Sequence, residues 1–109
     1  MNLSNLNASL DLKELYSTIP DDTDIIITHG PPKYFGDRVT HGNQVGSLSL
    51  TDRIREIKPK LVVSGHIHED RGIRTITHDE VETLVVNAAS EYGNIKDVII
   101  IELWVKCIV

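Results

Sequence analysis

Cysteine and long apolar runs are scarce in this chain of 109 residues. Cys107 is the only cysteine, so no disulfide joins two parts of the chain, and a lone thiol is typical of a reducing compartment. We therefore expect a cytoplasmic location. The longest apolar runs, such as Val98–Ile101, are far shorter than the roughly 20 residues that cross a bilayer. The first residues also lack the basic start and apolar stretch of a signal peptide.

A concentrated basic face is missing as well. The net charge is −5, and residues 1–24 alone hold five acidic residues against Lys13. Binding to nucleic acid through its phosphates requires clustered lysine and arginine, and binding to a membrane surface requires a basic amphipathic helix. We therefore expect neither a nucleic acid nor a membrane as partner.

Apolar periodicity and turn residues divide the chain into expected elements. Helices are predicted over residues 12–19, with Ser9 as N-cap, and over Leu50–Lys58, with a capping box of Ser49 and Asp52. An irregular loop fills residues 30–47. The first expected strand, Asp24–Thr28, has a continuous apolar run, which indicates burial on both faces. The expected strands, in chain order, are Asp24–Thr28, Lys60–Ser64, Ile73–Thr77, Glu82–Val86 and Asp97–Val105.

Three of the five histidines follow the first two of these strands. Strand, helix and strand form a βαβ unit, whose strands run parallel, and ligand sites of such sheets lie beyond the carboxyl ends of the strands. His29 follows the first strand, whereas His66 and His68 follow the second. Neutral imidazole is a good ligand for Zn, Mn and Fe, so these three residues are the candidate metal ligands. We expect His66 and His68, two apart in an extended segment, to point toward the same side.

Three motifs carry a resemblance to a known family: Thr-His-Gly-Pro-Pro at 28–32, Lys-Pro-Lys-Leu-Val-Val-Ser-Gly-His-Ile-His-Glu at 58–69 and Val-Val-Asn-Ala-Ala-Ser at 85–90. Together they resemble the C-terminal half of a calcineurin-like metallophosphoesterase, in its small metallophosphoesterase-domain-containing branch. The resemblance implies an α/β fold, the C-terminal half of an αββα sandwich, with a βαβ unit, a β-hairpin and a final strand. It also implies a dinuclear divalent-metal site that hydrolyses phosphate esters, with His29 and His66 on one metal and His68 on the other.

Other motifs of that family are missing from this chain. The family pattern also includes an Asp-x-His pair, a Gly-Asp-x-x-Asp motif with a bridging Asp, and a Gly-Asn-His-Glu/Asp motif with a catalytic His. All of these precede the strand that ends in His29, and the 28 residues before His29 contain no histidine. Gly42-Asn43 comes after His29, and Gln44 stands where the catalytic histidine would be. We therefore identify no catalytic residue and expect at most one Mn, Zn or Fe ion here, where the intact family holds two.

Three residues are candidates for the substrate side of the site. Asp37 and His41 lie in the long loop, where the resemblance places a lid, and Asn87 lies at a strand end near the site. For each a plainer interpretation stays open, as solvated loop residues or a structural asparagine. Glu69 and Asp70 would orient a metal-bound imidazole or remain turn residues without such a role. His78 is interpreted as a hairpin-turn residue.

Two functions remain open on this sequence. The first is a metal-dependent phosphoesterase, present as a C-terminal part and active when the N-terminal half is supplied; its substrate would be a phosphomonoester, a phosphodiester or a cyclic nucleotide. The alternative is a catalytically inactive remnant that binds a metal or a partner. Residues 1–109 would form one partial domain, with a helix and acidic turn over 1–23 and the core over 24–105. Half of a sandwich exposes an apolar sheet face, so we expect self-association or a partner chain.

Overall fold

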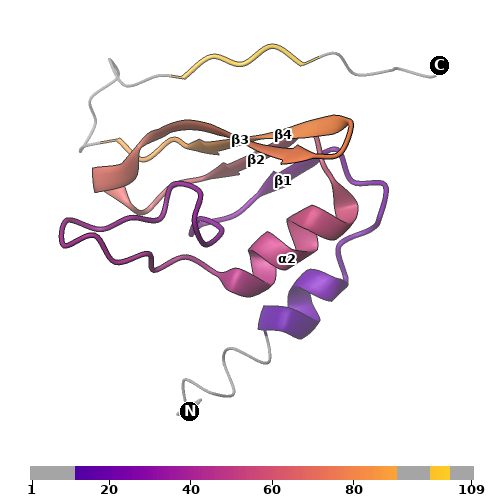
Figure 1. Ribbon diagram of the computed structural model, residues 1–109, viewed down its shortest axis with the longest axis horizontal. Coiled ribbons are helices and arrows are strands. Elements are labelled where there is room, and N and C mark those ends of the chain that lie inside the picture. Colours follow the sequence, from indigo (N-terminus) through magenta and orange to yellow (C-terminus); the bar gives the residue numbers. More distant parts are fainter. Residues whose placement is uncertain (1–11, 91–98, 104–109) are drawn as a thin grey trace.

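The computed structural model describes residues 12–90 and 99–103 and has an α/β fold. Its four-stranded open sheet has the order β1-β2-β4-β3, with β1–β2 and β2–β4 parallel and β3–β4 antiparallel. The helix of residues 12–17 and α2 lie on the same side of the sheet in Figure 1. The labelled elements are β1 (Ile25–Ile27), α2 (Leu48–Ile57), β2 (Leu61–Ser64), the 3₁₀ turn η1 (His68–Asp70), β3 (Gly72–His78) and β4 (Val81–Asn87).

Helix α2 is the crossover that makes β1 and β2 parallel. One stripe of its side chains packs into the core against the sheet, and these residues are Leu50, Ile54 and Ile57. The N-cap is Ser47, whose Oγ accepts the backbone N–H of Leu50 at 3.2 Å. The capping box predicted at Ser49 is therefore wrong, because the N-cap must have extended backbone and Ser49 already lies in the first turn. Lys58, with a left-handed φ of 56°, ends the helix before Pro59.

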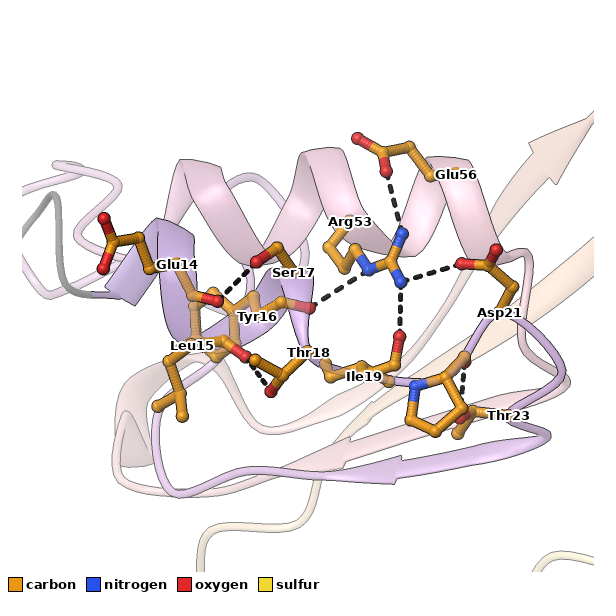
Figure 2. A network of polar contacts seen from close by, with 11 residues as sticks. Glu14, Leu15, Tyr16, Ser17, Thr18, Ile19, Asp21, Thr23, Arg53 and Glu56 are labelled. Carbon is orange, nitrogen blue, oxygen red and sulfur yellow. Dashed lines mark hydrogen bonds and ion pairs between the residues drawn. The ribbon is translucent and has the colours of Figure 1, made fainter.

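Arg53 of α2 holds the first helix against α2 (Figure 2). Its guanidinium donates to the carbonyl oxygens of Tyr16, at 3.1 Å, and of Ile19, and it pairs with Asp21 at 2.9 Å. These carbonyls lie at and just beyond the end of a short helix, where backbone acceptors lack partners within the helix. Tyr16 and Ile19 also pack against the core. The predicted first helix is thus confirmed, while its cap at Ser9 lies outside the described residues.

Strand β1 departs from the prediction of burial on both faces. Only Ile26 is buried, whereas Ile25 is 42% and Ile27 is 77% exposed. The reason is that β1 is an edge strand and the two helices cover one face of the sheet only. A continuous apolar run therefore does not guarantee two covered faces.

The predicted final strand is not seen in its described part. Residues 99–103 have no strand assignment, and the remaining residues of the Asp97–Val105 run lie outside the described residues. In Figure 1 the segment 99–103 lies on the opposite side of the sheet from α2. Its Ile100 is 85% exposed. Apolar, β-branched composition alone does not form a strand, and no described strand pairs with residues 99–103.

His78 is a buried residue and not a plain hairpin-turn residue as expected. It is 7% exposed, and its Nε2 lies 2.9 Å from Thr83 Oγ1, which itself donates to the carbonyl oxygen of Pro59. Because the Thr83 hydroxyl proton is used by Pro59, Nε2 of His78 must be the donor in this pair.

No helix within the described residues has the length and apolar character needed to cross a bilayer.

The pH dependence of stability tests the environment of His78. Burial, together with the positive charges of Lys58 and Arg55, lowers the pKa of His78. The unfolded chain then takes up a proton more readily, so this residue makes stability fall as the pH drops below about 6.5, until the lower folded pKa is passed. We expect the His78→Gln variant to lose less unfolding free energy than wild type between pH 7 and pH 5 in urea titrations. His41→Gln, at an exposed loop position, is the control, and an unchanged slope in His78→Gln would contradict the assignment.

Candidate functional site

The histidines that follow β1 and β2 lie side by side at the carboxyl edge of the sheet. The ring centroids of His29 and His66 are 4.7 Å apart, with the ring planes tilted by 43°. The parallel ladder continues past both strands, since Thr28 N–H donates to Val63 at 2.9 Å and Gly65 N–H donates to the carbonyl of His29 at 3.0 Å. Both imidazoles are exposed. Of the three histidines expected to come together, His29 and His66 thus lie side by side, and metal binding by them stays a prediction.

The backbone at His66 is strained. Its φ is 69°, in the left-handed region that residues with a Cβ rarely adopt, and Ile67 N–H closes a tight turn onto the Gly65 carbonyl at 2.8 Å. Such a conformation costs of order 1–3 kcal/mol and persists only where the surroundings hold it. The strained turn places the His66 ring beside the His29 ring.

His68 does not follow the geometry expected of it. We expected an extended segment with the two rings on one side, but His66 is left-handed and His68 begins the turn η1. The alternation of side chains along a strand therefore does not apply. In the part of the chain that the structure describes, no group of three or more His, Cys, Asp or Glu side chains is placed to hold a metal ion. His68 as a ligand stays a prediction.

The donor set present fits a divalent metal in part. Two neighbouring, exposed imidazoles suit Zn, Mn or Fe, and Zn in proteins takes four ligands, or three and a water. His29 and His66 thus supply two ligands of such a set. A hollow of about 450 Å³ borders the pair, with Thr28, Pro31 and Val45 among its walls.

The long loop of residues 30–47 is fastened to the turn that follows the histidines. Asp70 Oδ2 accepts the backbone N–H of Arg38 at 2.9 Å, and Glu69 Oε2 accepts that of Thr40 at 3.3 Å. A hydrogen bond from its own backbone N–H, with further bonds from Thr40, lowers the pKa of Glu69. The two carboxylates, for which orienting an imidazole was one of two open interpretations, thus bind the loop in the structure.

The three substrate-side candidates differ in exposure. His41 is exposed on the loop, whereas Asp37 and Asn87 are fully buried. Asp37 Oδ2 accepts the N–H of Gly46 at 2.9 Å inside the loop, and its Oδ1 has no hydrogen-bond partner in the described structure. Asn87 uses both ends of its carboxamide in protein hydrogen bonds. Substrate contact by these residues stays a prediction, and full burial weighs against it for Asp37 and Asn87.

Sequence reasoning missed the residues that shape the loop. Thr51, in the middle of α2, donates its hydroxyl to the carbonyl of Lys33 at 2.8 Å. Gly46 lies against the other end of the loop, where an added Cβ would be 2.7 Å from the carbonyl carbon of Pro32. A threonine on the buried face of an amphipathic helix was the available signal for the first contact, because a buried hydroxyl requires a partner.

Comparison with known proteins finds relatives named for a metallophosphoesterase domain. Metallophosphoesterase domain-containing protein 1 of Homo sapiens is 38% identical over 104 residues, which cover 91% of this chain and 31% of the human protein. The protein of the same name from Mus musculus has the same values. A UPF0046 protein of Caenorhabditis elegans is 35% identical over 72 residues, or 65% of this chain and 18% of that protein. No family model matches the chain. The chain spans about a third of the length of the first two relatives.

A pair of glycine substitutions tests the packing of the loop. In Gly46→Ala the new Cβ would meet only backbone atoms, of Pro31, Pro32 and Lys33, at 2.7–2.8 Å, so the loop must move. We expect a loss of about 1–3 kcal/mol in unfolding free energy, measured by urea titration. Gly30→Ala is the matched control, since no atom lies within 4 Å of its added Cβ. Equal stability of the two variants would contradict the close approach at Gly46.

Proposed function

We propose that this chain, which belongs to the metallophosphoesterase-domain family, carries part of the site of a metal-dependent phosphoesterase. The reaction would be hydrolysis of a phosphate ester at a site of two divalent metals. The observation that carries the proposal is the pair His29 and His66, which comes from segments 37 residues apart and meets at the carboxyl edge of the sheet.

Each histidine of the pair would serve as a metal ligand. His29 and His66 would each bind the metal through one ring nitrogen, and His68 would serve the second metal. When bound, divalent metals in such sites polarise the phosphate and lower the pKa of water to give hydroxide. The exposed rings and the hollow of about 450 Å³ beside them leave room for a phosphate ester. The hydrogen bond from Gly65 N–H to the His29 carbonyl keeps the two imidazoles in register.

The described residues supply an incomplete site, so we expect the chain alone to have little or no catalytic activity. Two dications about 3.5–4 Å apart repel strongly and require a bridging anion, whereas neutral imidazoles bring no negative charge. The general acid that protonates the leaving group, worth typically 10²–10⁴-fold in rate, would also come from elsewhere. The alternative, an inactive metal- or partner-binding remnant, is favoured by the same shortage of ligands near the pair.

Metal counting and turnover test the proposal on residues 1–109. We expect at most one weakly bound Mn or Zn per chain, lost in His29→Ala and in His66→Ala, and little or no hydrolysis of nitrophenyl phosphate mono- and diesters. Glu80→Gln is the control, because it removes a carboxylate in the hairpin turn at the far end of the sheet.

The outcomes separate the two functions. Hydrolysis that appears when a polypeptide carrying the N-terminal motifs is added would support the phosphoesterase. Metal binding without such activity would support the remnant. Two tightly bound ions per chain, with turnover in the usual 1–10³ per second range that His66→Ala abolishes, would contradict the incomplete site.

We also propose that the sheet face opposite α2 is covered by another chain. The strand register gathers aliphatic side chains on this face, namely Ile25, Ile27, Leu61, Val63, Ile73, Leu84 and Val86. Three of them, toward the edges of the sheet, are strongly exposed (Ile27 at 77%, Ile73 at 52% and Ile25 at 42%), whereas Leu61 and Val86 are buried. β1 also has only one neighbouring strand among the described residues, which leaves an edge able to pair. Without a complementing polypeptide, the isolated chain is expected to self-associate through this face.

Sedimentation tests the proposed self-association. We expect wild-type residues 1–109 to show a mass above 12.2 kDa that rises with concentration. Ile27→Lys places a charge on the face and should shift the distribution toward monomer, with little effect on folding because the side chain is exposed. Leu48→Lys, at a half-exposed position on α2, is the control. A monomer at every concentration, unchanged by Ile27→Lys, would contradict the proposal.

A further inference from the structure

One buried side chain joins the three segments that surround the histidine pair. Asn87, the last residue of β4, is 0% exposed. Its Nδ2 lies 2.8 Å from the carbonyl oxygen of Gly36, 2.7 Å from that of Ile67 and 3.2 Å from that of Asp70. These acceptors belong to the long loop, to the peptide between His66 and His68, and to η1. The Asn87 carboxamide therefore contacts the long loop, the turn that follows β2 and η1.

The orientation of this carboxamide follows from its partners. Oδ1 accepts the N–H of Ala89 at 2.9 Å, so the oxygen has a donor and the nitrogen faces carbonyls only. A flipped amide would place its oxygen against three other oxygens. An aspartate has the same shape but no N–H, and a leucine has a similar size but no polar atoms. The three carbonyls therefore call for a hydrogen-bond donor at this position, which neither aspartate nor leucine supplies.

The backbone of the long loop packs closely against Asn87. Gly36 has a φ of 89°, and a Cβ added to it would lie 3.0 Å from Cβ of Asn87. The loop backbone therefore passes directly over the side chain. On the other side, β2 and β4 pair in parallel with Ser64 opposite Asn87, immediately before Gly65 and the strained His66.

We propose that Asn87 is a positioning residue that holds the strained turn at His66 in place, through the Ile67 carbonyl, so that the His66 ring stays beside that of His29. This role acts through the backbone of the turn and requires no contact of Asn87 with a metal or a substrate. Without the amide donor, the Ile67 carbonyl keeps only the longer bond from the Asp70 N–H at 3.3 Å, and the turn relaxes toward ordinary backbone angles that move the His66 ring. The link to metal binding rests on the proposed function, whereas the ring position does not.

The test compares Asn87→Asp with a variant of equal burial on the same strand. Thr83→Val also removes a buried hydrogen-bonding group from β4, but at the opposite end of the sheet. Two readouts apply to the full chain of 109 residues: the proton NOE between the His29 and His66 rings without metal, and the affinity for Co²⁺. We expect Asn87→Asp to lose the NOE and to bind Co²⁺ at least about tenfold more weakly, as expected when a supporting hydrogen bond of a ligand is removed. Thr83→Val should keep both.

Asn87→Ser guards against an unfolded variant, since it retains one hydroxyl donor and should weaken the NOE by an intermediate amount. An unchanged NOE in folded Asn87→Asp, or an equal loss in Thr83→Val, would overturn the positioning role. If wild type does not bind Co²⁺ while Asn87→Asp still loses the NOE, the proposed function fails and the positioning role stands.

Discussion

The parallel pairing of β1 with β2 is the constraint on which the rest of this structure depends. Two parallel strands require a crossover, and α2 provides it by burying Leu50, Ile54 and Ile57 against the sheet. Each such side chain contributes roughly 1.5–3 kcal/mol when fully buried. The ladder then runs one step beyond the strands, to the hydrogen bond between Gly65 N–H and the carbonyl of His29. A packing interaction on one face of the sheet thereby sets the distance between two imidazoles at its edge.

Contacts between residues that are distant in sequence hold the carboxyl edge of the sheet together. The carboxylates of Glu69 and Asp70 bind the backbone of the long loop, and Asn87 joins that loop to the turn at His66. These polar contacts offset the strain of the left-handed His66, since a hydrogen bond contributes about 0.5–1.5 kcal/mol net. The segments around His29 and His66 are thus joined by polar contacts, whereas on the sheet face opposite α2 the side chain of Ile27 stays exposed.

The sequence predicted the elements well where periodicity and topology decide them. The βαβ unit, the hairpin and the shared edge of His29 and His66 all follow from apolar spacing and from the rule for parallel strands. It did not predict that β1 is an edge strand, because an apolar run has the same appearance with one or two faces covered. Nor could it show the contacts of Asn87, whose partners lie 51, 20 and 17 residues away and share no local pattern.

We propose that His29 and His66 bind one divalent metal together. X-ray absorption of the chain loaded with Zn tests it most directly, because imidazole ligation gives a distinct signal from the ring carbons. The account predicts two imidazole nitrogens at about 2.0–2.1 Å, reduced to one in His29→Ala and likewise in His66→Ala. Zn ligated by oxygen only, or a signal unchanged in both variants, would contradict it.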